Sequence, residues 1–371
     1  MNPLTQRLLA QQLISPQFTS PHDVVAWMGL VQAQDYKMMR WAVGMRCKTP
    51  STRAFEKDFN EGRIIRTHLF RCTWQLVAGE DLAWMLELCN NTARRRLIGW
   101  MNTNHISIPE AEQEKVQAVF VDVLEKRRSA LKGELNEALI DKGIVMEEHR
   151  FSYHLRLAEY AGLICSGDLS PLNRTFSLVD RKVPRMLSLS RAEALATLAW
   201  KYFQSHGPAT FEDYSWWSGL NLSECRQGIN AIADELVQER WRGLNFISCK
   251  DSRVRGFRSG TVHLLPPYDE YLIGYKSRHV SLRPEYSSRA HNGSGNFWPV
   301  LLQDGEVIGN WSAQGGKASK GMDTHKAGKP KQVSHTPLAE KVNVDVFHAQ
   351  AALSEPALQR EQERYRKFLA K

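Results

Sequence analysis

The sequence predicts an α+β protein with three tandem winged helix-turn-helix units and a C-terminal β-rich region. Pairs of helical patterns joined by short turns are followed by short β-rich runs more than once, and the pattern becomes β-rich after residue 268. A chain of 371 residues is long enough for several such units. We expect the first unit and a helical extension at 1–125, the second unit at 126–185, the third at 186–268, and the β-rich region with a terminal helix at 269–371.

The first unit is expected to begin with a helix that starts at Ser20. A serine cap followed by proline in the first turn is a common helix start, and apolar residues at helical spacing continue to about Leu30. A polar helix follows near STRAFEKDFNEG (51–62). The alternation within RIIRTHLFRCTWQLV (63–77) indicates a half-exposed strand. Helices at 83–101 and after Pro109 then lead to the second unit.

The second unit is predicted from LKGELNEALIDKGI (131–144) and the helix HRFSYHLRLAEYAGLI (149–164), with RTFSLVDRKVP (174–184) as its wing. In the third unit, Thr210 and Asp213 form a helix cap, the first helix ends at Gly219, and Ser223 caps the second. The basic segment KDSRVRGFR (250–258) lies between two short β runs, where a winged helix carries its wing.

The region after residue 268 contains one clear hairpin signal. The stretch FWPVLLQDGEVIGNWSAQ (297–314) places Asp304 and Gly305 between two apolar runs, as in a hairpin turn. The tail SEPALQREQERYRKFLAK (354–371) returns to a helical pattern. Asp269 and Tyr271, in the aromatic turn PPYDEYLIGY, are interpreted as structural residues.

Composition and charge limit the function classes. The net charge is +9, which favours a polyanionic partner, although mild basicity also occurs in proteins without one. No apolar run is long enough to span a membrane, so we expect a soluble, cytoplasmic protein. The six cysteines form no CxxC pair, which predicts buried thiols and argues against a zinc site, and no cofactor motif occurs. The candidate DNA-binding residues are Arg66, Arg71, Arg94, Arg95, Arg96, Lys250, Arg253, Arg255, Arg258, Lys317 and Lys320.

The stretch GLVQAQDY (29–36) places two glutamines two residues apart after a helix. Residues at this spacing point to the same side of an extended chain but to different faces of a helix, so a joint role requires an extended chain. The alternative is that Gln32 and Gln34 are solvated or cap nearby carbonyl groups. Asp35 follows them directly and is a second candidate for a catalytic base.

Several separated motifs in the same order resemble the bacterial tandem winged-helix DNA-binding family that includes the AlkZ-like DNA glycosylases. They are VQAQD, RIIRTHLFRCTWQLV, YAGLI, HGPATFEDYSWWSGL, LLPPYDEYLIGYKSR and VLLQDGEVIGNW. The resemblance implies that Gln32 and Gln34 are the catalytic pair of the glutamine-x-glutamine branch. It also implies a double-stranded DNA substrate with alkylated or crosslinked purines. The run Arg71 to Gln75 departs from relatives that often carry a histidine there.

Glutamine chemistry is compatible with that activity. Glycoside hydrolysis usually needs a carboxylic acid and a carboxylate, but an N7-alkylated purine is already a cation and leaves without an acid. Two amides on one face of an extended chain can orient a water through their carbonyl oxygens. We therefore expect a monofunctional glycosylase that acts as a monomer. The alternative is a non-catalytic winged-helix DNA-binding protein or transcriptional regulator, although three units in one chain differ from a regulator that pairs identical units on a palindrome.

Overall fold

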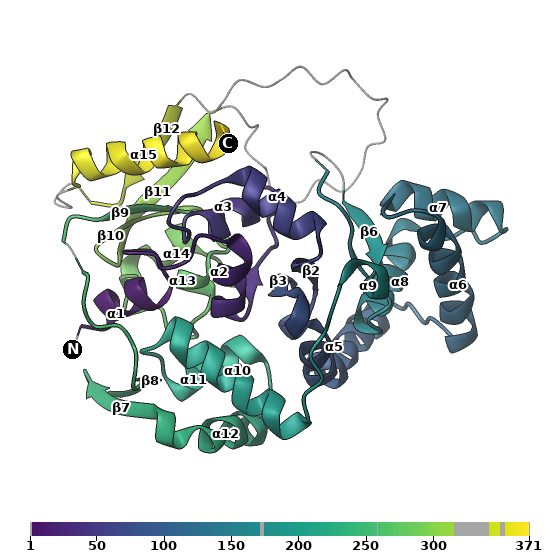
Figure 1. Cartoon of the computed structure of the whole chain (residues 1–371), viewed down its shortest axis with the longest axis horizontal. Coiled ribbons are helices and arrows are strands. Elements are labelled where there is room, and N and C mark those ends of the chain that lie inside the picture. Colours follow the sequence, from purple (N-terminus) through teal and green to yellow (C-terminus); the bar gives the residue numbers. More distant parts are fainter. Residues whose placement is uncertain (1, 171–173, 258, 315–340, 349–352, 371) are drawn as a thin grey trace.

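The computed structural model describes residues 2–170, 174–257, 259–314, 341–348 and 353–370 (Figure 1). Three of the candidate DNA-binding residues, Arg258, Lys317 and Lys320, lie outside the described residues. Within these ranges no helix combines the length and the apolar character needed to cross a lipid bilayer. All six cysteines are buried thiols outside any disulfide, as the sequence predicts.

The first unit has the chain order helix, strand, helix, helix, strand, strand. Its strands form one antiparallel sheet in the order β1-β3-β2. The elements are α2 (Pro21–Met28), β1 (Val31–Gln32), α3 (Met39–Gly44), α4 (Thr52–Asn60), β2 (Ile64–His68) and β3 (Trp74–Ala78). Ser20 stands at the start of α2, but its hydroxyl donates to Asp58, and the same carboxylate accepts the backbone N–H of His22. Asp58 therefore does the capping expected of Ser20.

The segment expected as one half-exposed strand is a buried hairpin. All five residues of β2 are buried, because α8 packs beside the strand. The turn between β2 and β3 is the short helix η1 (Phe70–Cys72), which packs against the long helix α5 (Leu82–Thr103) and against α11 of the third unit. The loop that would be the wing of the first unit is thus an internal contact.

The second unit repeats the same order and lies at one end of the molecule in Figure 1. Its sheet order, β4-β6-β5, matches that of the first unit. The elements are α6 (Glu110–Lys126), β4 (Ala130–Leu131), α7 (Lys132–Asp141), α8 (Glu148–Tyr160), β5 (Ile164–Ser166) and β6 (Thr175–Leu178). The wing expected at 174–184 is confirmed only in part, as one strand of the β5-β6 hairpin. Those residues form β6 and the short helix α9 (Val179–Lys182), because the apolar residues of β6 pair with β5 and fill the core.

The third unit has three helices and a hairpin: α10 (Arg191–His206), α11 (Phe211–Ser218), α12 (Leu222–Ala231), β7 (Leu236–Trp241) and β8 (Leu244–Cys249). A bridge between Ala209 and Ile247 takes the place of its first strand. The cap of α11 by Thr210 and Asp213 and its end at the left-handed Gly219 are confirmed. Asn221, rather than the expected Ser223, caps α12 through a reciprocal bond pattern with Glu224.

The expectation of a wing at 250–258 is wrong. The strand β8 pairs with β7 through the turn at Arg242 and Gly243, whereas β9 (Val262–Leu265) pairs with β10 in a different sheet. The basic segment therefore connects the third unit to the C-terminal region. The reason is that the apolar β9 is buried in the C-terminal core, which moves it out of the unit expected at 186–268.

The C-terminal region is a four-stranded antiparallel sheet in the order β12-β11-β10-β9, covered by the helix α15 (Glu355–Ala370). The remaining elements are β10 (Val300–Gln303), β11 (Glu306–Gln314), β12 (Lys341–Val346), α13 (Glu270–Ile273) and α14 (Ser287–Ala290). The hairpin at Asp304 and Gly305 is confirmed. The N-terminal helix α1 (Pro3–Ala10) contributes Leu8 and Leu9 to this core, so it packs outside the unit expected at 1–125.

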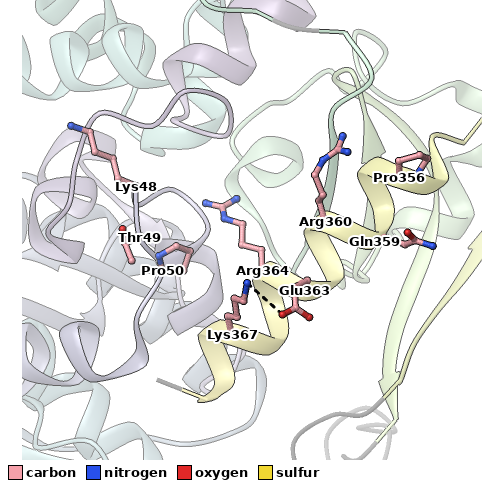
Figure 2. Close-up of a pocket in the computed structure, with 9 residues that line it drawn as sticks. All are labelled: Lys48, Thr49, Pro50, Pro356, Gln359, Arg360, Glu363, Arg364 and Lys367. Carbon is pink, nitrogen blue, oxygen red and sulfur yellow. Dashed lines mark ion pairs between the residues drawn. The ribbon is translucent and has the colours of Figure 1, made fainter.

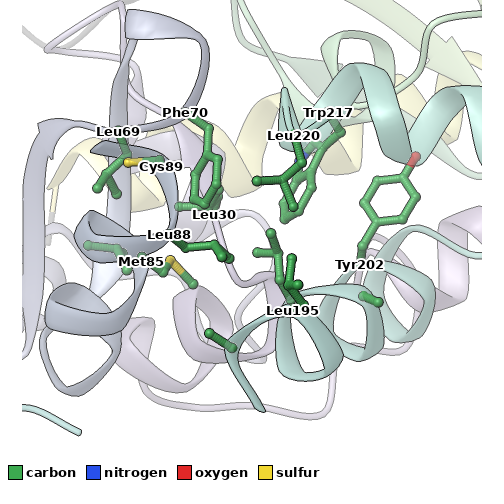
Figure 3. Close-up of a cluster of buried hydrophobic side chains, with 14 of the residues drawn as sticks. Leu30, Leu69, Phe70, Met85, Leu88, Cys89, Leu195, Tyr202, Trp217 and Leu220 are labelled. Carbon is green, nitrogen blue, oxygen red and sulfur yellow. The ribbon is translucent and has the colours of Figure 1, made fainter. Parts of the chain in front are cut away.

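One hydrophobic core joins the sheet of the first unit to the helices of the third. Figure 3 shows Leu30, Leu69 and Phe70 on one side and Leu195, Tyr202, Trp217 and Leu220 on the other. Burying apolar side chains of this size contributes about 1.5–3 kcal/mol each. The two units are therefore held in a fixed relation.

A buried ion pair joins three separate parts of the chain. Arg46, after α3, donates to both carboxylate oxygens of Asp269 at 2.8 and 2.9 Å and to the side chain of Gln11 at 2.9 Å. Asp269 also accepts the backbone N–H of Tyr271 at the start of α13, which supports the structural role expected for both. Because each charge has a close partner, the desolvation cost of burial is offset.

His263 gives the fold a predictable pH dependence. The side chain is buried in β9, and neither ring nitrogen has a hydrogen-bond partner among the described residues. Burial, with smaller effects of Arg364 and Arg46, lowers the pKa of His263 from 6.5 to about 3. Between pH 6.5 and pH 3 the histidine is protonated in the unfolded chain but neutral in the folded chain. The free energy of unfolding is therefore unaffected by His263 above pH 6.5 and decreases as the pH falls below it.

We predict that His263→Leu flattens the loss of stability between pH 7 and pH 5. The wild-type chain should lose about 2 kcal/mol through this histidine at pH 5, because each pKa unit corresponds to about 1.4 kcal/mol. Urea unfolding at both pH values measures the effect, with His279→Leu at an exposed position as the control. An unchanged pH dependence in His263→Leu would contradict the assignment.

Candidate active site

The glutamine pair lies at the edge of the first sheet. Gln32 in β1 is opposite Gln75 in β3, and the N–H of Ala33 donates to the carbonyl of Trp74 at 2.8 Å. The extended chain expected across both glutamines is confirmed only at Gln32, because the strand ends there and Gln34 lies in a bend. In the alternating antiparallel pattern, the bond at Ala33 makes Gln32 and Gln75 a non-hydrogen-bonded pair, whose side chains lie closest. Gln34 lies in the bend that follows β1, and its side chain bonds the backbone of β3 at Trp74.

The hydrogen bonds orient the two amides differently. The carbonyl oxygen of Gln34 accepts the backbone N–H of Trp74 at 2.9 Å, so its NH₂ group points away from this bond. The NH₂ group of Gln32 donates to the hydroxyl of Thr73 at 3.1 Å, and that hydroxyl lies 3.4 Å from the carbonyl of Phe70. Because a backbone N–H can only donate, the amide of Gln34 has one consistent orientation. The expected arrangement of two equivalent carbonyl acceptors needs correction, because the Gln34 carbonyl is already engaged.

A row of buried polar side chains crosses the sheet at Gln32. The register places Gln32, Gln75 and Thr67 opposite one another on β1, β3 and β2, and all three are buried. The carbonyl oxygen of Gln32, both amide atoms of Gln75 and the hydroxyl of Thr67 have no hydrogen-bond partner among the described residues. Buried polar groups of this kind are costly without a partner. Such atoms cluster where water or substrate is bound.

Glu270 fixes the backbone of Gln32. Its carboxylate is buried, and one oxygen accepts the N–H of Gln32 at 2.8 Å. The other oxygen accepts the indole N–H of Trp217 at 3.2 Å and lies 3.4 Å from a ring nitrogen of His206. The position of Gln32 thus depends on α13 and on the third unit. Sequence analysis missed Glu270, whose only signal was a carboxylate within an aromatic turn.

Arg66 supports the same strand from its other side. Its Nε and Nη2 donate to the carbonyl of Ala33 at 3.1 and 3.0 Å, and its guanidinium carbon lies 3.8 Å from the ring centroid of Trp74. The side chain is fully buried, and burial lowers its pKa. The expectation that Arg66 binds DNA from a half-exposed strand is not supported by this placement. Arg66 is instead a positioning residue for the glutamine segment.

Asp35 holds the turn that leads into α3. One carboxylate oxygen accepts the backbone N–H groups of Lys37 and Met38, both at 2.9 Å. This pattern is an ordinary helix-start arrangement of an aspartate. The role of Asp35 as a second-rank base stays a prediction. Its hydrogen bonds to this turn explain an aspartate at this position without a catalytic role.

The remaining candidate cations lie on several surfaces. Arg94, Arg95 and Arg96 are exposed on α5, and Lys250 and Arg255 are exposed on the connecting segment. Arg253 is half-buried and donates to the carbonyl of Ser15 at 3.0 Å. Their contact with DNA stays a prediction. Arg71 lies in the internal turn η1 and is considered separately below.

A basic groove that sequence analysis did not identify lies between α15 and the loop before α4. It has a volume of about 700 Å³, and Figure 2 shows Arg360, Arg364 and Lys367 on the helix opposite Lys48. Among the described residues that line it, Glu363 is the only acidic one, and it pairs with Lys367. The described residues contain no group of three or more His, Cys, Asp or Glu side chains arranged to hold a metal ion.

A family model described as "DNA glycosylase AlkZ-like" matches residues 25–368. An interstrand DNA cross-link repair glycosylase of Streptomyces sahachiroi is 25% identical over 324 residues, which cover 82% of this chain and 85% of the relative. The solved structure of Streptomyces sahachiroi DNA glycosylase AlkZ superposes with a TM-score of 0.77 at 21% identity and covers 99% of this chain and 95% of that one. These matches favour the enzyme over a non-catalytic regulator.

We predict that Arg66→Leu lowers the rate of base release from DNA containing N7-methylguanine by about tenfold or more, because a small displacement of a reacting group has a large effect on rate. Arg66→Lys should be intermediate, since one ammonium cannot reproduce the two bonds of the guanidinium. Affinity for undamaged duplex should stay near wild type in both variants. Wild-type release by a normally folded Arg66→Leu protein would show that this contact does not position the pair.

Proposed function

This chain belongs to the AlkZ-like family of DNA glycosylases, and from that premise we propose its substrate and its catalytic residues. The proposed substrate is a cationic N-alkylpurine in double-stranded DNA, and the enzyme hydrolyses its N-glycosidic bond without a covalent lyase step. The Streptomyces relative is named a cross-link repair glycosylase, so interstrand crosslinks through such purines are a further proposed substrate. Gln32 and Gln34 are the proposed catalytic residues.

The observation that carries the proposal is the buried carbonyl oxygen of Gln32, which has no hydrogen-bond partner in the described part of the chain, two residues before the fixed amide of Gln34. The N7-alkylated base leaves with its positive charge neutralised, so no acid is needed. The positive charge moves to the sugar as the bond breaks, and an amide oxygen in a desolvated site stabilises it or orients a water towards it. Neither role requires the glutamine to exchange a proton.

Gln34 contributes a hydrogen-bond donor, whereas Gln32 contributes an acceptor. The carbonyl of Gln34 is bound to the sheet at Trp74, and its NH₂ group is left as a donor on a partly exposed side chain. A donor at this place can bind a phosphate oxygen or an acceptor on the base edge. The pair therefore combines an acceptor at Gln32 with a donor at Gln34. This replaces the water clamp of two carbonyls that the sequence suggested.

The repeated architecture supports three winged-helix units. The first two units share one order of elements and one sheet order, and the third has a bridge in place of its first strand. Winged helices commonly bind duplex DNA through helices and backbone contacts. We assign the exposed arginines of α5 and the cations Lys250 and Arg255 to phosphate contacts, together with the basic groove at α15. Lys317 and Lys320 keep the same proposed role from the sequence alone.

We predict that Gln32→Ala and Gln34→Ala each lower the single-turnover rate of N7-methylguanine release by about a hundredfold or more, since a group that orients or stabilises the reacting centre is worth a few kcal/mol. DNA affinity should change little, because the interaction acts in the transition state.

The exposed Gln17 provides a matched control, and Gln17→Ala should release base at the wild-type rate. Thermal unfolding of all three variants tests whether they are folded. Wild-type release rates in both Gln32→Ala and Gln34→Ala would remove the pair from the mechanism.

A further inference from the structure

Two adjacent tryptophans at the end of α11 have opposite environments. Trp217 is buried and donates to Glu270, the carboxylate that holds the backbone of Gln32. Trp216 is 42% exposed, and its indole N–H donates to the carbonyl of Ile273 at 3.2 Å. The ring of Trp216 is therefore fixed in orientation while much of its surface is open to solvent. This exposed ring is one residue from the network that positions the catalytic strand.

Two arginines lie beside that ring. The guanidinium carbons of Arg71 and Arg278 are 5.6 and 5.9 Å from the ring centroid of Trp216, within the range of a cation–π contact. Nε and Nη2 of Arg71 are buried and have no hydrogen-bond partner among the described residues. Burial, and then the charge of Arg71, lowers the pKa of Arg278 to about 10. Arg278 donates to the carbonyls of Leu272 and Lys276, so the unused donors belong to Arg71. Two neighbouring desolvated cations, one of them with unused donors, form a favourable place for an anion.

The backbone at Arg71 has an unusual conformation, which indicates a functional role for this turn. Arg71 and Cys72 have φ values of 60° and 58°, a conformation that residues other than glycine seldom adopt. This turn brings Arg71 against Gly219 at the end of α11, where an added Cβ would lie 3.2 Å from Cγ of Arg71 and 3.4 Å from Nη1 of Arg96. The arginine of the first unit is thereby placed beside the tryptophan of the third.

The same turn leads directly to the glutamine pair. Thr73, two residues after Arg71, accepts the NH₂ group of Gln32. The turn η1 therefore contacts the ring of Trp216 through Arg71, and Thr73, which follows it directly, binds the amide of Gln32. Glu270 binds the backbone of Gln32 and the neighbouring Trp217. A nucleotide whose sugar is near Gln32 would have its base or its phosphate close to this cluster.

We propose that Trp216, Arg71 and Arg278 form the binding site for one unstacked nucleotide of the DNA at the lesion. The base stacks on the indole, and a phosphate oxygen lies between the two guanidinium groups. Stacking on an aromatic side chain tolerates any base, which suits an enzyme that must act in any sequence. The inference rests on the proposed function, and it assigns a contact with the substrate outside the glutamine pair.

Binding to a duplex with one bulged adenine, compared with the fully paired duplex, tests the stacking. Wild type should prefer the bulged duplex, and Trp216→Ala should reduce that preference by about tenfold, in line with the stacking energy of one base. Trp216→Phe should retain most of it. Trp100→Ala is the matched control, because Trp100 is 45% exposed on α5, and it should bind like wild type.

The outcomes separate the inference from the proposed function. An undiminished preference in a folded Trp216→Ala protein overturns the inference, as does an equal loss of affinity for both duplexes, which would indicate a backbone contact alone. Release of N7-methylguanine is measured for the wild type in parallel. Absence of release would contradict the proposed function, whereas the binding preference is measured on DNA without a lesion and still decides the role of Trp216.

Discussion

The hydrogen bond between the buried carboxylate of Glu270 and the backbone N–H of Gln32 is the contact on which the arrangement of the site depends. A charged acceptor strengthens such a bond, and removal of the carboxylate would leave buried donors unpaired. The same carboxylate binds Trp217 of the third unit. The preceding residue, Asp269, pairs with Arg46 after α3. Two adjacent acidic residues thus join the C-terminal region, the first unit and the third unit around the glutamine segment.

This construction explains why glutamine chemistry is feasible here. An amide is a weak catalyst unless its orientation is fixed, because it neither gives nor takes a proton. Ala33 is held by Arg66 on one side and by Trp74 on the other, and Gln32 is held by Glu270. Folding has already oriented these amide dipoles, whereas water molecules would have to reorient during the reaction. Such preorganisation is the condition for electrostatic stabilisation of a charged transition state.

The same packing limits which surfaces of the protein can contact DNA. The turn η1 in the first unit is part of the hydrophobic core, with Phe70 buried against the third unit. A wing packed in this way cannot lie along a DNA backbone, and its proposed DNA contact is limited to Arg71 beside the ring of Trp216. DNA contacts are more consistent with the exposed arginines of α5, the ring of Trp216 and the basic groove at α15. The site then lies where parts from separate units meet.

Much of the architecture could be predicted from local signals. Caps at Thr210 and Gly219, the hairpin at Asp304 and the extended chain at Gln32 each depend on a few neighbouring residues, and the structure contains all of them. The failures have a common physical cause. The wing at 250–258 and the exposure of Arg66 depend on which strand pairs with which and on what packs over it, and local periodicity does not encode such long-range contacts.

Contacts distant in sequence also explain why Glu270 and Gln75 were missed. Glu270 is 238 residues from Gln32, and nothing in the local pattern indicates that its carboxylate turns inward. Gln75 becomes a candidate only when the register places it opposite Gln32. The family resemblance identified the glutamine pair, but the amide orientations and their supports could be read only from the three-dimensional structure.

Positioned amides, and no carboxylate, are proposed to perform the reaction. Single-turnover N7-methylguanine release at saturating enzyme, measured for Asp35→Asn beside Gln32→Ala, tests this most directly. Asp35→Asn should release base near the wild-type rate, because its side-chain oxygen can still accept the N–H groups of Lys37 and Met38, whereas Gln32→Ala should release base about a hundredfold more slowly. Loss of release in a folded Asp35→Asn protein, with release retained in Gln32→Ala, would contradict this and assign the catalysis to Asp35.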